Sequence, residues 1–220
     1  MISQKKYSNY FRSHYKYSFA ANDLKKHHDW FFSQWKFINK QVDLNVSKSV
    51  LEIGSSIGGF IQFLDSRGIK NIVGIDMDKE AVGFAKKIFP MYTFINSSIE
   101  KLNFKTNYDY IFGFEVLEHL ENPIFSISKI HKLLKKNGMF IGTSPFPYYK
   151  NIYADSTHTY VLHPSNWYKL FFEAGFSEIS IYPMTYFPLL WRLSRRLNIR
   201  LPIYLPFKYF ISTTLIIAKK

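Results

Sequence analysis

The side chains with the clearest capacity for chemistry are Glu115, Glu118 and His119, which stand close together in one short segment. Side chains at i, i+3 and i+4 share one face of a helix, so a single helical turn would bring the three together. Two carboxylates and an imidazole suit a divalent cation such as Mg²⁺ or Mn²⁺, with water in the remaining positions. His158 is a candidate fourth ligand. Without a metal, His119 would act as a general base, since its unperturbed pKa of about 6.5 suits proton transfer from a hydroxyl; a purely structural role is the third interpretation.

A second group of candidate functional residues follows the apolar run at 49–53, which predicts a buried strand. After Glu52 the chain enters a glycine-containing turn, residues 54–58, and then a helical pattern. Such a turn lets ligand atoms approach the backbone at the carboxyl edge of a parallel sheet. Asp76 ends the next apolar run, where a carboxylate can accept hydrogen bonds from both ribose hydroxyls of a nucleoside. The glycine spacing fits neither a dinucleotide nor a triphosphate site, which favours a nucleoside without a pyrophosphate.

The elements that position these residues alternate between short apolar runs and helical stretches, which predicts repeated βα units on a parallel sheet. We expect helices at 58–66, 79–88, 123–136 and 164–174, with Asn137-Gly138 ending the third because glycine adopts the left-handed conformation of a helix end. We expect strands at 49–53, 71–76, 92–95, 108–114, 139–143, 176–182 and 212–218. The fold class is therefore α/β.

Over roughly residues 45–183 these motifs resemble class I S-adenosylmethionine-dependent methyltransferases. The resemblance implies a Rossmann-like, seven-stranded, mostly parallel sheet with helices on both faces and an antiparallel last strand. Ser56 stands where the family has the middle glycine of its cofactor loop, and Ser98 stands where it usually has an Asp for the adenine amino group. At Ser98 the contact with adenine would be weaker, or the backbone of Ile99 would make it. The implied S-adenosylmethionine site comprises Glu52, Gly54, Ser55, Ser56, Gly58, Asp76, Met77, Ser98, Ile99 and Phe114.

The segment Glu115-Val116-Leu117-Glu118-His119 resembles the Glu-x-x-Glu-His motif of ubiquinone-pathway O-methyltransferases. Together with a distant histidine, His158, it also resembles small-RNA 3′-terminal ribose methyltransferases, in which a metal binds the acceptor hydroxyls. The resemblance implies methyl transfer to a hydroxyl oxygen of a small, lipid-linked or glycan-type acceptor. The alternatives are a metal-dependent RNA ribose O-methyltransferase and a non-catalytic cofactor-binding scaffold.

Composition limits the class of protein. The chain has 220 residues, 47% hydrophobic and 20% charged, which is enough for one domain with a buried core and excludes a disordered tail. There is no cysteine, so disulfides, thiol nucleophiles and Cys-based metal sites are excluded. No uncharged apolar run reaches the roughly 18 residues of a membrane span. These features predict a soluble, cytoplasmic protein, or one that lies on a membrane surface.

The net charge of +13 is concentrated at the two ends of the chain. Residues 184–220 carry seven basic and no acidic side chains, and within them leucines and arginines would occupy opposite faces of a helix around Trp191. That pattern is typical of a lid or dimer face, of peripheral contact with an anionic membrane, or of RNA backbone contact, with nucleic acid the less favoured partner. We predict a single domain: an N-terminal helical cap at 1–45, a cofactor-binding core at 46–183, and a basic amphipathic insertion with a closing strand at 184–220.

Overall fold

A single eight-stranded sheet forms the centre of the computed structural model, which describes residues 21–40, 42, 44–103, 106–148, 155, 157–187, 199–205 and 211–220. The strand order is β3-β2-β1-β4-β5-β8-β6-β7. β1 to β5 are mutually parallel where they pair, whereas β8 is antiparallel to both β5 and β6. The strands are β1 Val50–Ile53, β2 Ile72–Asp76, β3 Thr93–Asn96, β4 Tyr108–Phe114, β5 Leu134–Pro145, β6 Glu178–Phe187, β7 Ile199–Leu201 and β8 Ile211–Lys219.

The predicted seven-stranded sheet with an antiparallel last strand is thus confirmed, and the connection before β8 adds one short strand. This strand, β7, pairs antiparallel with β6 at the edge of the sheet. The central strands are apolar at consecutive positions because both faces of the sheet are covered. Val50 and Leu51 show this: both are fully buried, yet they belong to the cores on opposite faces.

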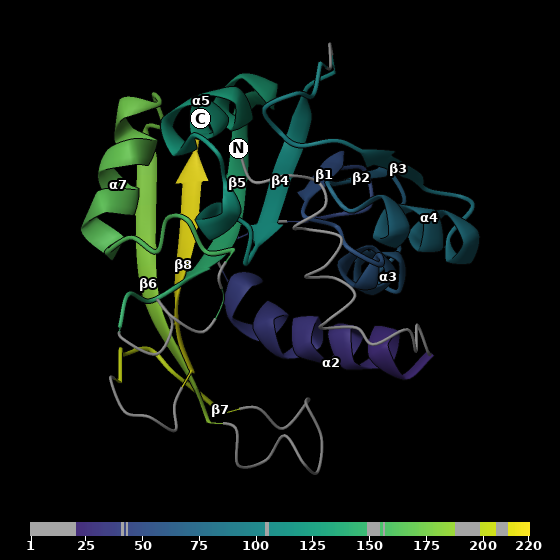
Figure 1. The fold of residues 1–220 in the computed structure, drawn as a ribbon, viewed down its shortest axis with the longest axis horizontal. Coiled ribbons are helices and arrows are strands. Elements are labelled where there is room, and N and C mark those ends of the chain that lie inside the picture. The colour runs from purple at the N-terminus through teal and green to yellow at the C-terminus, as the bar shows by residue number, and fades with distance from the viewer. Residues whose placement is uncertain are drawn as a thin grey trace.

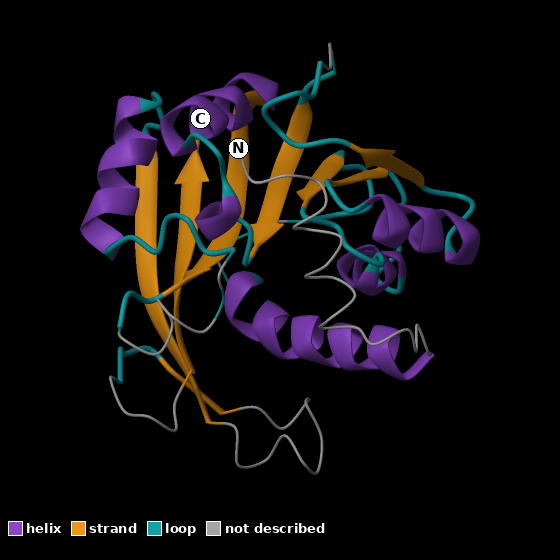
Figure 2. Ribbon diagram, in the orientation of Figure 1, coloured by secondary structure: helices purple, strands orange, loops and turns teal. Residues whose placement is uncertain are grey.

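Helices cover the two faces of the sheet in two groups (Figures 1 and 2). Residues of α2 (Ala21–Ile38), α3 (Gly59–Asp65) and α4 (Lys79–Ile88) pack in one core, and those of α5 (Pro123–Leu133) and α7 (Pro164–Glu173) in the other. Asp78 caps α4 by accepting from the amides of Glu80 and Ala81, and Asn122 caps α5 directly before Pro123. These caps place both helix starts at the carboxyl edge of the sheet, just after β2 and β4. In Figure 1, α2 lies across the same edge, below the tip of β4.

Two predicted boundaries are wrong. At the first, α5 ends at Leu133 rather than residue 136 and β5 begins at Leu134 rather than residue 139, because Leu134 is fully buried opposite Tyr108 of β4. The left-handed residue that follows is Asn137, with φ 63°, and not Gly138. Gly138 is needed for a close approach instead, since a Cβ there would lie 3.0 Å from the carbonyl oxygens of Asp109 and Lys135.

The second wrong boundary is the end of β6, which continues to Phe187 instead of stopping at residue 182. Four residues assigned to the basic insertion, 184–187, therefore belong to the sheet. Pairing with β8 explains the extension, because Thr185 is fully buried opposite Ser212. Most of the predicted amphipathic helix, residues 188–198, lies outside the described residues, as does the part of the N-terminal cap that precedes α2. The prediction is wrong at Arg200, which belongs to strand β7 and pairs with Tyr186 of β6. Within the described part of the chain, no helix is long and apolar enough to cross a membrane.

Candidate functional site

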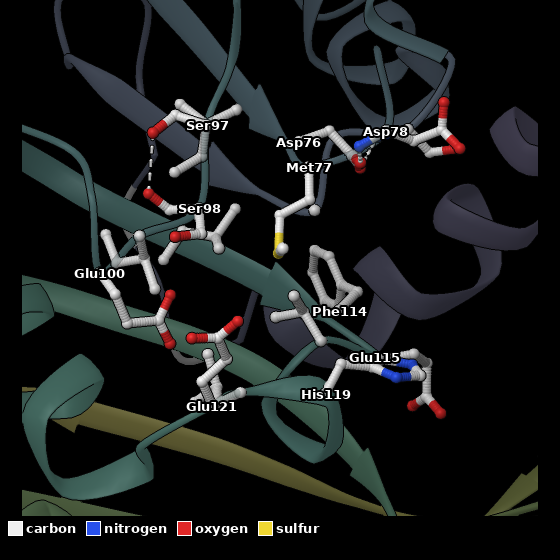
Figure 3. A pocket seen from close by; sticks show the side chains of 17 residues that line it. Asp76, Met77, Asp78, Ser97, Ser98, Glu100, Phe114, Glu115, His119 and Glu121 are labelled. Atoms are coloured by element: carbon white, nitrogen blue, oxygen red, sulfur yellow. Dashed lines mark hydrogen bonds between the residues drawn. The ribbon is translucent and has the colours of Figure 1, made fainter. Parts of the chain in front are cut away.

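A cavity of about 260 Å³ opens at the carboxyl edge of the sheet, where β1, β2 and β4 end. Its walls come from the turn after β1, from Asp76 to Asp78, from residues 97–100, and from the segment 114–121. Figure 3 shows Met77 beside Asp76 and Phe114, with Glu115 and His119 on one side of the cavity and Glu100 and Glu121 on another. The cavity therefore joins the two groups of residues that the sequence singles out.

The turn after β1 reverses sharply because three of its residues adopt the left-handed conformation. Gly54 and Gly58 have φ angles of 73° and 86°, and Ser56 between them has φ 46°. A residue with a Cβ is strained there by roughly 1 kcal/mol, so Ser56 keeps the conformation that glycine would favour at some cost. In return, the amide of Ser56 points toward β2 and donates a hydrogen bond of 2.8 Å to Oδ2 of Asp76.

The carboxylate of Asp76 is held by backbone amides on both of its oxygens. Ser56 N–H donates to Oδ2, and Asp78 N–H donates to Oδ1 at 2.7 Å. Burial raises the pKa of Asp76 to about 6, although these amide hydrogen bonds oppose the rise. Each carboxylate oxygen can accept more than one hydrogen bond, so both remain able to receive ribose hydroxyls. The geometry fits the nucleoside-binding role expected of Asp76.

The cavity contains most but not all of the residues predicted to bind the cofactor. Seven of them line it: Gly54, Ser56, Asp76, Met77, Ser98, Ile99 and Phe114. Glu52, Ser55 and Gly58 lie behind the wall, where Gly58 precedes α3 and Ser55 is 2% exposed. Glu52 is buried, and its pKa is raised well above the ordinary value by burial and by the negative charge of Asp76.

Beside the cavity, Glu118, His119 and His158 form a compact group of potential metal ligands. One donor atom from each lies within 4.8 Å of the others. Oε1 of Glu118 is 3.9 Å from Nε2 of His119 and 4.0 Å from Nε2 of His158. The imidazole rings are 5.0 Å apart between centroids. Metal–nitrogen and metal–oxygen distances are about 2.1 Å, so one ion can contact donors spaced in this way.

Glu118 is the most unusual of these side chains. It is fully buried, and within the described part of the chain neither carboxylate oxygen makes a hydrogen bond of ordinary geometry. Burial raises the pKa of Glu118 well above its usual range, and the negative charge of Glu115 raises it further. A buried carboxylate whose nearest histidine nitrogens are about 4 Å away, too far for a hydrogen bond, is costly, and a cation held between these groups would offset the cost. This observation shows that the residues present fit a divalent cation.

The backbone explains how residues far apart in the chain meet here. Leu117–His119 form a single 3-10 turn, η1, so the predicted helical turn is tighter than an α-helix. The carbonyl of Glu118 accepts hydrogen bonds from the amides of Thr159 (2.8 Å) and Tyr160 (3.0 Å). These two bonds anchor the segment that carries His158 directly onto η1. His119 is enclosed by this contact, and burial, followed by the proximity of His158, lowers its pKa to about 4.

Glu115 lies near this group but is not one of its members. Its φ of 51° turns the backbone out of a helical path before η1 begins, so Glu115 does not share a helix face with Glu118. Glu115 lines the cavity, and its Oε1 accepts a hydrogen bond of 3.0 Å from Thr213 Oγ1 of β8. The structure therefore brings together three of the four predicted metal ligands and places the fourth at the wall of the cavity.

Sequence reasoning did not select several residues that shape this site. Asp78, Ser97, Glu100 and Glu121 all line the cavity. Asp78 carries a recognisable signal, since an Asp directly before a helical pattern is a typical N-cap. Thr157, whose hydroxyl contacts His119, has no comparable signal because its partner is 38 positions away.

Part of the chain is similar in sequence to known methyltransferases. Residues 51–142 match the family model described as a methyltransferase domain. A ubiquinone biosynthesis O-methyltransferase of Pelagibacter ubique is 36% identical over 99 residues, which are 43% of this chain and 41% of the relative. The putative methyltransferase 235L of Invertebrate iridescent virus 6 is 26% identical over 112 residues, 50% of this chain and 42% of the relative. The matches thus span less than half the length of these curated relatives.

Solved structures extend the likeness over the whole fold. A methyltransferase dependent on S-adenosylmethionine from Thermotoga maritima has a TM-score of 0.71 at 16% identity, covering 97% of this chain and 99% of its own. One from Archaeoglobus fulgidus has a TM-score of 0.69 at 19% identity, covering 96% and 99%. Phosphoethanolamine N-methyltransferase 2 of Haemonchus contortus, solved with S-adenosylmethionine, has a TM-score of 0.68 at 15% identity, covering 100% and 60%. The chain has the Rossmann-like fold of these S-adenosylmethionine-dependent methyltransferases, and residues 51–142 of it match a methyltransferase domain.

Proposed function

We propose that this protein transfers a methyl group from S-adenosylmethionine to a hydroxyl oxygen, with a divalent cation held by Glu118, His119 and His158. The observation that carries the proposal is the buried carboxylate of Glu118, which lies about 4 Å from the two imidazoles, beside the cavity of about 260 Å³. S-adenosylmethionine would supply a methyl group activated on a sulfonium, and the cation would lower the pKa of the acceptor hydroxyl. The similarity to a ubiquinone biosynthesis O-methyltransferase supports oxygen as the methylated atom.

In this proposal, Asp76 serves cofactor binding and His119 serves metal binding. Asp76 would accept the ribose hydroxyls while the amides of Ser56 and Asp78 hold its carboxylate in place. The lowered pKa of His119 keeps its imidazole neutral near pH 7, as a metal ligand requires. A base with so low a pKa is poorly matched to a hydroxyl, which favours the metal-assisted interpretation over the metal-free one.

The donor set narrows the identity of the cation. With Glu115 outside the group, the ligands are one carboxylate and two imidazoles. Imidazole favours the softer divalent ions and carboxylate the harder ones, so of the two ions expected from the sequence this set favours Mn²⁺ over Mg²⁺. Water and the acceptor oxygens would complete the coordination.

The acceptor is tested with methyl-labelled S-adenosylmethionine and fractionated cell extract, in Mn²⁺ or in EDTA. We expect metal-dependent label in a small-molecule, lipid or carbohydrate fraction. Label in RNA would support the ribose methyltransferase instead. Label that EDTA leaves unchanged would refute the metal role, and tight cofactor binding with no label in any fraction would support a non-catalytic scaffold.

Peripheral membrane contact stays a separate proposal. It depends on the basic residues of 184–220, several of which lie outside the described residues. Co-sedimentation with vesicles containing anionic lipid, compared with neutral vesicles, tests it directly. Electrostatic attachment should weaken as salt is raised, since the Debye length shortens from about 10 Å at 0.1 M to about 3 Å at 1 M.

A further inference from the structure

The segment that carries His158 also contacts His119 through Thr157. Nδ1 of His119 lies 3.2 Å from the carbonyl oxygen of Thr157 and 3.1 Å from its hydroxyl oxygen, Oγ1. Thr157 is 2% exposed, so this contact is shielded from water. The hydroxyl of Thr157 is in turn 2.6 Å from Oδ1 of Asp155. Asp155, Thr157 and His119 therefore form a short chain of hydrogen bonds behind the metal ligands.

The direction of these hydrogen bonds follows from which atoms carry protons. Oδ1 of Asp155 already accepts from the amide of Thr157 at 2.7 Å, so it is an acceptor, and the hydroxyl of Thr157 donates to it. A hydroxyl has one proton, which leaves Oγ1 with only acceptor capacity toward His119. The carbonyl of Thr157 is likewise an acceptor. The two oxygens of Thr157 near Nδ1 are therefore both acceptors, so Nδ1 must carry the proton. In a neutral imidazole, Nε2 is then unprotonated.

The tautomer matters because Nε2 is the atom that faces the other ligands. Nε2 of His119 is 3.9 Å from Oε1 of Glu118. Asp155 also reaches the second histidine, since its Oδ2 lies 3.9 Å from Nε2 of His158. One carboxylate behind the group thereby acts on both imidazoles, through Thr157 on one and directly on the other. Such partners orient metal-ligating histidines and select their tautomer.

We propose that Asp155 and Thr157 are positioning residues that hold His119 as the Nδ1-protonated tautomer and direct the lone pair of Nε2 toward Glu118. The proposal rests on the proposed metal site for its functional meaning. The tautomer itself does not depend on the metal, on the cofactor or on an acceptor. It can therefore be tested in the protein without any of them.

The first experiment is a long-range ¹H–¹⁵N spectrum of the histidine side chains in EDTA at mildly alkaline pH, with His119→Gln used for assignment. We expect the Nδ1-protonated pattern for His119. His163 is an internal reference with the opposite arrangement, because its Nδ1 accepts from the amide of Ser165 and so favours a proton on Nε2. An Nε2-protonated pattern for His119 in the wild-type protein overturns the proposal.

The second experiment compares Thr157→Val, Thr157→Ser and Asp155→Ala, with Thr93→Val as the control because Thr93 is exposed at the start of β3. Loss of one hydrogen bond should shift the tautomer ratio by about fivefold in Thr157→Val and Asp155→Ala. Their affinity for Mn²⁺, measured by titration calorimetry, should fall by about 10- to 100-fold. Thr157→Ser and the control should keep both values, and affinity for S-adenosylmethionine should be unchanged in all four.

The readouts separate the two proposals. If the wild-type protein does not bind Mn²⁺ but shows the expected tautomer, the proposed metal site is refuted and the positioning role of Asp155 and Thr157 is supported. If Mn²⁺ binds and Thr157→Val keeps the wild-type Mn²⁺ affinity and tautomer ratio, the positioning role is refuted and the proposed metal site is supported. A loss of Mn²⁺ affinity in Thr157→Ser that Thr157→Val does not share would assign Thr157 to packing, because serine lacks the methyl group that valine keeps.

Discussion

Replacing Glu118 by methionine should stabilise the protein while removing the proposed metal site. The carboxylate is fully buried with both oxygens lacking a hydrogen bond of ordinary geometry within the described residues. A buried polar group left unsatisfied costs about 1–3 kcal/mol, and replacing buried charges by apolar side chains of similar volume often gains about 1–4 kcal/mol. We therefore expect Glu118→Met to raise the free energy of unfolding by about 1–3 kcal/mol in EDTA.

The assay is urea unfolding of both proteins in EDTA and in saturating Mn²⁺. At a Mn²⁺ concentration 100 times its Kd, the wild-type protein gains about 2.7 kcal/mol and the variant gains nothing. Saturating Mn²⁺ should therefore make the wild-type protein as stable as Glu118→Met, or more stable. Glu173→Gln is the control, since Glu173 is exposed on α7 and its removal should change neither condition by more than about 0.5 kcal/mol.

The same comparison has a predicted pH dependence. The pKa of Glu118 is raised in the folded state, so the folded protein binds the proton more tightly than the unfolded chain does. The wild-type protein then loses stability relative to Glu118→Met as the pH rises from about 4.3, the unperturbed value, toward the folded-state pKa. A variant that is less stable than wild type in EDTA, or equal stabilisation of both proteins by Mn²⁺, would refute the reasoning.

Three further predictions concern the cofactor loop and its neighbours. Asp76→Ala should weaken binding of S-adenosylmethionine, and in the wild-type protein this affinity should fall by up to about tenfold per pH unit below about pH 6, where Asp76 becomes protonated; calorimetric affinities that stay flat across that pH would contradict the ribose role. Ser56→Gly should raise the free energy of unfolding by up to about 1 kcal/mol, because the φ of 46° favours glycine, whereas Ser56→Ala keeps the strain and should not. His119→Ala should reduce turnover far more than cofactor affinity, and equal losses in the two measurements would make it structural.

The sequence predicted the order of elements and the glycine-containing turn after the first strand well because both depend on local rules. Apolar runs buried on both faces mark parallel strands wherever they occur, and the bounds of β4 and α4 agree with the prediction residue for residue. The conformation of the turn at 54–58 is equally local, since few residue types tolerate three left-handed positions in five. Asp76 follows from its place at the end of a strand.

Boundaries set by long-range contacts were beyond such rules. α5 stops early because the burial of Leu134 beside β4 outweighs the helical preference of residues 134–136. β6 is longer than its own pattern indicates because β8 offers it a partner as far as Ile211. In both cases the deciding contact joins residues distant in the chain.

The proposed metal ligands also show what the sequence could predict and what the tertiary structure decided. The sequence determined that Glu115, Glu118, His119 and His158 have the right chemistry, but only the tertiary structure decided which of them meet. A residue at φ 51° sends Glu115 to the wall of the cavity, and two backbone hydrogen bonds to Glu118 bring His158 into contact. No sequence motif marks Asp155 and Thr157. Their proposed role depends on a contact between Thr157 and His119, which are 38 positions apart in the chain, and on which atom of that contact carries the proton. Residue types set which chemistry is available, and the folded backbone sets which atoms face each other.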